Sequence, residues 1–253
     1  MGGAFDFRCE FASLVRDHRD PSRPVVLPQR LPKQAEECAI SEISLIYGDP
    51  GRNRTCIAQA ELEALARTTH ETVSLEVYDG HAAAVAVCQI DGPNLTPMPD
   101  MTGRPVAMHA IAAGKVLLAS LPERTVLSIA RRGLTSYTSR TITDPRALLE
   151  ELAAVRRRGY ALGVGEWDER IAAAAVPVCD ARGTVIATVV VWGSSARVNP
   201  STLQNLVNAA RDTARQISVK LGWSGEAQRR TGIVPAIKEE DEDEFSVDDE
   251  AAV

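Results

Sequence analysis

The sequence has few aromatic residues and no long apolar run. Phe, Trp and Tyr together make up 4% of its 253 residues, so a core has to be built mainly from Ala, Val, Leu and Ile. No apolar stretch approaches the ~20 residues that a membrane-spanning helix needs. The N-terminal end also lacks the basic start and apolar stretch of a signal peptide. We therefore expect a cytoplasmic protein without a membrane partner.

The cysteines show no pattern. The five are scattered without a CxxC pair, and the four histidines do not cluster with them. Such a set is typical of idle thiols in a reducing compartment rather than of a disulfide framework or a metal site. No Ser, His and Asp set is arranged like a catalytic nucleophile with its base. We therefore expect no metal, no cofactor and no catalytic residue, and hence a protein that is not an enzyme.

The net charge of −6 comes from the end of the chain. Residues 237–253 hold nine acids and one lysine, a local charge of −8, so residues 1–236 carry +2 (−6 minus −8). A body so close to neutral lacks the broad basic face that drives nucleic-acid binding. The acidic end is too charged to pack into a core, so we expect residues 224–253 to be a disordered tail.

Regular patterns begin after residue 56. Four prolines within residues 21–32 exclude a helix there, so residues 1–56 are expected to be irregular or poorly ordered. Beyond them, Asp-Gly and Gly-containing turns between alternating runs predict two hairpins, over 72–91 and 171–193. A loop over 94–107 and a short strand from 160 are also expected. Helical spacing, caps and stops predict five helices, over 58–69, 109–121, 121–133, 144–159 and 199–223.

This order of elements predicts an α+β fold. Hairpins make antiparallel strands, so we expect one antiparallel sheet with helices packed against it. The segments 171–178 and 184–192 are apolar on both alternating faces, so this hairpin is expected at the centre of the sheet, covered on both sides. The predicted domain occupies residues 57–223.

A Gly114-Lys115 pair lies within the predicted helix 109–121, HAIAAGKVLLASL. A phosphate-binding loop would need glycine where His109 stands, and Ser or Thr where Val116 stands. A glycine on a helix face instead indicates close approach of a strand, a second helix or a ligand.

Two charged clusters each allow two interpretations. The Glu-Trp-Asp-Glu run at 166–169 could supply paired carboxylates for acid–base chemistry, although polar residues in such a loop are usually solvated. The three arginines at 156–158 could bind phosphate, but their place at a helix C-terminus favours interaction with the helix dipole.

Several motifs together resemble the effector-binding domain of IclR-type transcription regulators. The stretch MHAIAAGKVLLASLP at 108–122 is similar to the family's His-Ala-x-x-x-Gly-Lys-x-x-Leu-Ala signature. TSRTITD at 138–144, RGYA at 158–161 and AVPV at 175–178 resemble further family motifs in the same order, over about residues 57–222. The resemblance implies a GAF-like sensor domain that forms dimers or tetramers and binds a small-molecule effector, which changes how the protein holds DNA.

The N-terminal segment departs from that family. Its members carry a winged helix-turn-helix ahead of the sensor domain, but residues 1–56 have too few helix-competent stretches and no net positive charge for one. A degenerate or lost module, a wrongly assigned start or upstream frameshift, and a sensor that works without DNA would each explain this. We expect a ligand-responsive transcription regulator, with a free-standing sensor or interaction module as the alternative.

The resemblance also implies a ligand site, which departs from the family as well. Family sensors of small acids present an acid, a cysteine and two hydroxyl groups, and this chain has no ionisable or hydroxyl group at the matching positions. Such a lining favours an apolar or aromatic effector over a small carboxylate. Plain core packing is the alternative for each residue. The implied ligand-binding residues are Met98, Val106, Ala112, Ala113, Gly163, Ala173, Val190 and Trp192.

Overall fold

The computed structural model describes residues 16–17, 20–24, 58–93 and 99–225. Nearly all of the predicted acidic tail, Met98 and most of the N-terminal segment therefore lie outside the described residues. Within that segment, strands β1 (Arg16–Asp17) and β2 (Asp20–Pro24) form a separate antiparallel pair, so the interpretation of residues 1–56 as irregular misses this short hairpin.

The main sheet has six strands in the order β5-β4-β3-β8-β7-β6, and each neighbouring pair is antiparallel. Strand β8 lies near its centre with nearly every residue buried, which confirms the predicted central hairpin. The strands are β3 (Thr72–Tyr78), β4 (Ala83–Ile90), β5 (Pro105–Ala107), β6 (Ala161–Val164), β7 (Ile171–Cys179) and β8 (Val185–Ser194).

Strand β5 corrects the loop predicted over 94–107. It pairs with β4 through Pro105, Val106 and Ala107. A proline usually argues against a strand, but β5 is an edge strand, where a missing backbone donor is tolerated.

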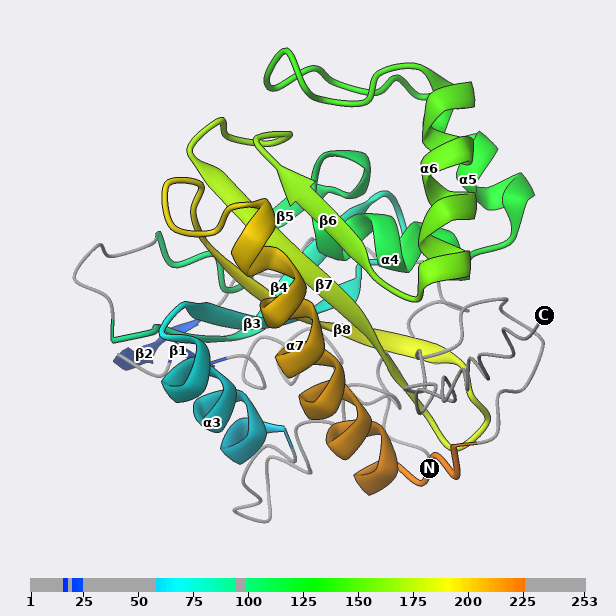
Figure 1. Ribbon diagram of the computed structural model, residues 1–253. Coiled ribbons are helices and arrows are strands. Elements are labelled where there is room, and N and C mark those ends of the chain that lie inside the picture. The colour runs from blue at the N-terminus through cyan, green and yellow to red at the C-terminus, as the bar shows by residue number, and fades with distance from the viewer. Residues whose placement is uncertain (1–15, 18–19, 25–57, 94–98, 226–253) are drawn as a thin grey trace, which may run out of the picture.

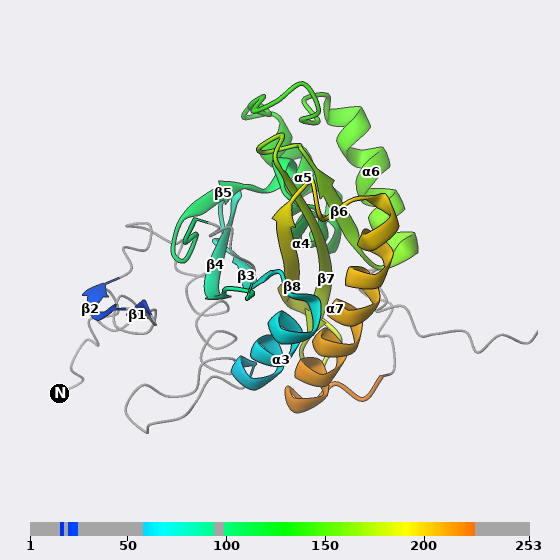
Figure 2. The same ribbon diagram turned by 60° about the vertical axis from the view of Figure 1, so that its left-hand side comes forward.

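Helices cover both faces of the sheet. Helices α3 and α7 lie side by side against one face (Figures 1 and 2). On the other face α4 packs on β7 and β8, and α6 packs on α4. No helix in the described ranges is long and apolar enough to cross a membrane. The helices are α3 (Gln59–Thr69), the 3-10 turn η2 (Met108–Ala110), α4 (Ala112–Ser120), α5 (Glu123–Ala130), α6 (Pro145–Arg158) and α7 (Pro200–Lys220).

Helix ends and turns follow the local signals in the sequence. The Asp144 side chain accepts a hydrogen bond from the backbone N–H of Ala147, and Gly159 ends α6 in the left-handed conformation (φ 72°). Asn199 forms a capping box with Thr202 at the start of α7. In the β3–β4 turn, the Asp79 carboxylate accepts from three successive backbone N–H groups. These predicted boundaries are confirmed.

The predicted helix 109–121 is interrupted. Ile111 is extended (φ −133°, ψ 151°), so η2 ends before it and α4 begins after it. A Cβ atom on Gly114 would lie 2.2 Å from both the Cα and the carbonyl oxygen of Met108. The close approach predicted from Gly114 is therefore confirmed, and of the three expected partners it is a second helix, the short 3-10 helix η2, whose backbone lies against it.

Lys115 is buried and ion-paired. Its side chain is 2% exposed, and its Nζ lies 2.7 Å from Oε1 of Glu166 and 3.4 Å from Oε1 of Glu151. Arg158 donates to the same Glu151 oxygen at 2.7 Å. Burial raises the pKa of the Glu166 carboxyl, an effect that the Lys115 ammonium opposes. The interpretation of residues 166–169 as solvated is thus wrong for Glu166, which ties its loop to α4.

The arginines at the end of α6 bind backbone carbonyls. The Arg156 Nε donates to the carbonyl of Ala119 in the last turn of α4, and the Arg158 Nε donates to that of Tyr160. The favoured interpretation placed these cations at the C-terminus of their own helix, whereas Arg156 caps the C-terminus of α4 instead.

Replacing Gly114 with alanine should destabilise the protein. In an ordinary helix this change stabilises, but here the methyl group would meet the η2 backbone, so we expect a loss of about 3 kcal/mol in the free energy of unfolding. Urea denaturation measures it. Gly133→Ala is the control, because nothing lies within 4 Å of its Cβ position and only the φ of 102° opposes the change. Equal small effects at both positions would contradict the close approach.

Replacing Lys115 with methionine should leave the partly buried Glu166 carboxylate without its cation, while Glu151 keeps its ion pair with Arg158. We expect a loss of about 3–5 kcal/mol, the usual range when one partner of a buried ion pair is removed. Thermal and urea denaturation measure it. Arg146→Ala breaks an exposed pair with Glu150 and should change nothing measurable. A Lys115→Met protein as stable as the parent would show that the network contributes no stability.

Candidate functional site

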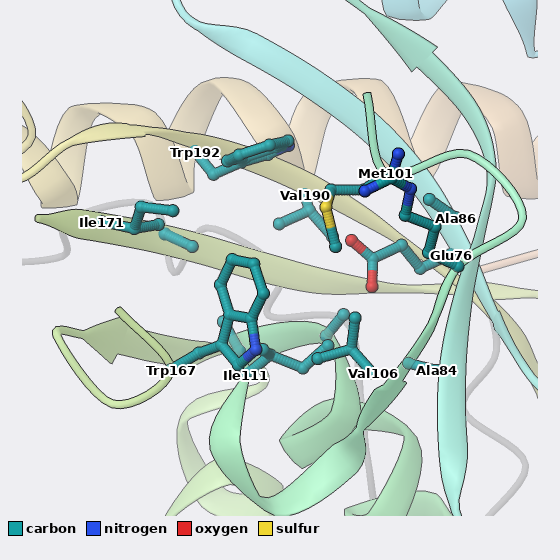
Figure 3. Close-up of a pocket in the computed structure, with 14 residues that line it drawn as sticks. Glu76, Ala84, Ala86, Met101, Val106, Ile111, Trp167, Ile171, Val190 and Trp192 are labelled. Carbon is teal, nitrogen blue, oxygen red and sulfur yellow. The ribbon is translucent and has the colours of Figure 1, made fainter. Parts of the chain in front are cut away.

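A pocket lies between the sheet and the start of α4 (Figure 3). Its empty volume is about 500 Å³, a figure that includes open solvent at its mouth. Strands β3, β4, β5, β7 and β8 contribute to its walls, together with α4 and the loop after β6. The lining residues are Glu76, Ala84, Ala86, Met101, Arg104, Val106, Ile111, Ala112, Ala113, Trp167, Ile171, Ala173, Val190 and Trp192.

The structure brings together six of the eight residues that the sequence implied. Gly163 is not in the lining. Its place on β6 lies against α4, where a Cβ atom would come within 3.1 Å of the Ala112 backbone nitrogen. Gly163 therefore lets the first turn of α4 approach the sheet. The six residues that line the pocket are Val106, Ala112, Ala113, Ala173, Val190 and Trp192.

Strand pairing sets which side chains enter the pocket. Glu76 on β3 pairs with Ala86 on β4 and with Thr188 on β8, and partners in such pairs share a face of the sheet. The β3–β4 register shifts between Leu75 and Glu76. Leu75 pairs with Cys88 but Glu76 pairs with Ala86, so β4 has one extra residue at this point. This bulge turns Ala86 toward the pocket beside Glu76.

Small side chains create the hollow. Five of the lining residues are alanines, two of them on β4, two in the first turn of α4 and one on β7. A larger residue at any of these positions would fill space that a ligand could occupy. The alanines are therefore consistent with a binding pocket, whereas a packed core tends to fill such space.

Glu76 is the main functional candidate that sequence reasoning missed. Its carboxylate points into the pocket (Figure 3) and accepts a hydrogen bond from the Ser74 hydroxyl at 3.0 Å. Burial raises the pKa of this carboxyl to about 7, although the Ser74 hydrogen bond opposes the rise. The alternation of Glu76 with Val73, Leu75 and Val77 places the acid on the opposite face of the strand, but only the structure shows that this face lines a pocket.

Two tryptophans face the pocket from opposite sides (Figure 3). Trp192 on β8 is 6% exposed, and its indole N–H has no hydrogen-bond partner among the described residues. Trp167 comes from the loop after β6, which sequence reasoning treated only as a charged segment. Thr138 and Thr141 hold this loop, because their hydroxyls donate to the carbonyls of Gly165 and Glu166, each at 2.6 Å.

The geometry suits binding rather than covalent chemistry. In the described ranges, no three His, Cys, Asp or Glu side chains gather as a metal site would require. Cys88 and Cys179 are buried thiols, and burial raises the pKa of Cys179 to about 12. The lining itself contains one acid and no cysteine, serine or histidine.

A solved structure of a transcription factor domain is similar to this chain. The chain is similar to the inducer-binding domain of the transcription factor PobR from Acinetobacter, which was solved as a double mutant in complex with 3-hydroxybenzoic acid. The identity is 34%, the match covers 64% of this chain and 95% of that one, and the TM-score is 0.60.

The curated relatives regulate transcription. The transcriptional regulator KipR of Bacillus subtilis is 32% identical over 169 residues, which cover 66% of this chain and 67% of KipR. The transcriptional repressor AllR of Escherichia coli K12 is 30% identical over 172 residues, which cover 68% of this chain and 63% of AllR. The match thus spans less than two thirds of AllR. Both relatives are named as regulators of transcription and not as enzymes.

A family model describes most of the ordered domain. The model of the C-terminal domain of the bacterial transcriptional regulator IclR matches residues 53–219, close to the range over which the motifs showed their resemblance. The chain therefore belongs to the IclR family of bacterial transcriptional regulators.

Proposed function

We propose that this protein is a ligand-responsive transcription regulator, and that the pocket between the sheet and α4 is its effector site. The observation that carries the proposal is the lining, where twelve of fourteen side chains are Ala, Val, Ile, Met or Trp. A wall of this kind gains about 25 cal/mol for each Å² of apolar ligand surface that it buries. It therefore favours an apolar or aromatic effector.

The two tryptophans support an aromatic effector in particular. Trp167 and Trp192 face each other across the pocket (Figure 3), and an aromatic ring between them gains contact area together with the offset or edge-to-face geometry that aromatic pairs prefer. The neighbouring PobR domain was solved with an aromatic acid. The aromatic ring of that ligand supports an aromatic effector for this chain. We do not infer from its carboxylate that the effector of this chain is an acid.

The proposed regulator also binds DNA and associates with copies of itself. KipR and AllR are described as regulators of the helix-turn-helix type, and we propose that this protein also acts on DNA, as a homodimer or tetramer. The near-neutral charge of residues 1–236 favours a second candidate, a sensor module that pairs with another regulator and does not bind DNA itself.

Trp192→Ala should abolish ligand-induced stabilisation. The probes are indole and 2-phenylethanol, two neutral aromatic molecules, and the readout is the melting temperature of the intact chain with and without them. Loss of the indole removes one wall of the pocket, so the rise in melting temperature should disappear. Trp192→Phe is the matched control and should keep most of the rise. Unchanged stabilisation in Trp192→Ala would place the ligand elsewhere, and no stabilisation of the parent would contradict the effector site.

Binding to DNA decides between regulator and sensor module. The intact protein is titrated onto the DNA upstream of its own gene, and onto random DNA, across a salt series. A regulator should bind its own DNA more tightly, with an affinity that falls steeply as salt rises. Absence of binding even at low salt would favour the sensor module, and a protein partner would then have to supply the DNA contact.

A further inference from the structure

The pocket is lined by one carboxylate and one cation, which form no ion pair with each other. Of its fourteen lining residues only Glu76 and Arg104 are ionisable, and Arg104 is an exposed residue. No ion pair joins Glu76 to any residue that the structure describes. The Ser74 hydroxyl binds one carboxylate oxygen, and the other has no hydrogen-bond partner among the described residues.

Such a carboxylate is unfavourable unless something neutralises it. Its neighbours across the pocket are Val190, Met101 and Val106, which offer it no hydrogen bond (Figure 3). Glu76 is half-buried, and partial transfer of a charge from water into apolar surroundings is costly, which is the cause of the rise of its pKa to about 7. A ligand that brings a positive charge to Glu76 would offset this cost, and the attraction would strengthen as the bound ligand displaces water from the half-buried carboxylate.

The start of α4 favours the opposite charge. Ala112 and Ala113 lie in its first turn, where backbone N–H groups are free of helical partners and carry a partial positive charge equivalent to about half a unit. Glu76 carries a full negative charge when ionised. Because this charge is larger than the partial charge at the helix start, we expect the pocket to prefer a positively charged ligand. A ligand carboxylate would also place two anions in one cavity, whereas a neutral oxygen on the ligand can accept from the helix without that penalty.

We propose that the effector is an aromatic molecule with a protonated amine, whose ring lies between Trp167 and Trp192 and whose amine donates to the free oxygen of the Glu76 carboxylate. The inference rests on the proposed function, because it assigns a ligand class to the same pocket.

Binding of such an amine should depend on pH. The groups that face Glu76 are the Ser74 hydroxyl on β3, Thr188 on β8, whose hydroxyl donates to the Glu76 carbonyl, and Arg104 from the segment before β5. The lining residues from α4, β4 and β7 are all apolar. Glu76 is therefore the group that titrates near pH 7, and amine affinity should rise as pH rises through about 7 and then level off.

The unliganded protein gives an independent check. The pKa of Glu76 is higher in the folded chain, about 7, than its ordinary value of 4.5. Its contribution to stability is thus complete below pH 4.5 and is lost as pH rises through 7. Glu76→Gln should become more stable relative to the parent as pH rises from 5 to 8. Glu150→Gln, which changes an exposed acid outside the pocket, should follow the parent. Identical pH profiles for Glu76→Gln and the parent would show that this carboxyl is not held in an apolar environment.

The decisive experiment compares three probes of similar size. Calorimetry of the intact chain at pH 8 measures binding of phenethylamine, neutral 2-phenylethanol and anionic 3-phenylpropanoate. We expect phenethylamine to bind most tightly, and Glu76→Gln to weaken it by at least about tenfold while leaving 2-phenylethanol nearly unchanged. Ser74→Ala provides a second variant in case the first folds poorly. It removes a hydrogen bond that lowers the Glu76 pKa, so the pH dependence of amine binding should shift to higher pH.

The outcomes separate this inference from the proposed function. If 2-phenylethanol binds but phenethylamine binds no better, or if Glu76→Gln leaves the preference for the amine unchanged, the amine assignment is wrong and the effector site stands. Tightest binding of 3-phenylpropanoate would mean that Arg104 or the start of α4 receives an anion, and would also overturn the assignment. If none of the three probes binds, both the effector site and the amine assignment fail.

Discussion

The close packing of the η2–α4 segment is the constraint on which the rest of the domain depends. Gly114 lets the backbone of η2 lie directly against α4, and Gly163 lets the first turn of α4 approach β6. Because α4 is held at two points, its first residues form a wall of the pocket. The same packing buries Lys115 and directs it to Glu166, in the loop that carries Trp167. The contacts that hold α4 in the fold are therefore the same contacts that place its first turn and the Trp167 loop at the pocket.

The pocket combines two opposing tendencies. Alanines at five lining positions leave a hollow, and apolar walls make it favourable for an uncharged ring. The same walls make the Glu76 carboxylate unfavourable without a partner. A protein that needed only stability would replace this acid with an apolar residue. Its presence is best explained by a ligand that meets it, in the way that strained or charged groups often mark functional sites.

Local signals in the sequence predicted most of the fold. Caps, Asp-Gly turns and helical spacing act over a few residues, so α3, α5, α6, α7 and both main hairpins were predictable. The break at Ile111 was not, because it arises from the packing of η2 on α4. Strand β5 has only three residues, and its edge position alone makes its proline acceptable. Apolar positions of the site followed from the family resemblance, but Glu76 and Trp167 reach the pocket through strand register and loop anchoring, which no short motif encodes.

Titration of the Glu76 carboxyl shows whether this acid lies in apolar surroundings and meets an amine. The carboxyl ¹³C shift of Glu76 in labelled protein, assigned by comparison with Glu76→Gln, is followed through the pH range with and without phenethylamine. We expect a midpoint near 7 in the free protein, which moves clearly downward when the amine binds. A midpoint near the ordinary 4.5 that does not respond to the amine would contradict this expectation, because Glu76 would then be a solvated surface acid.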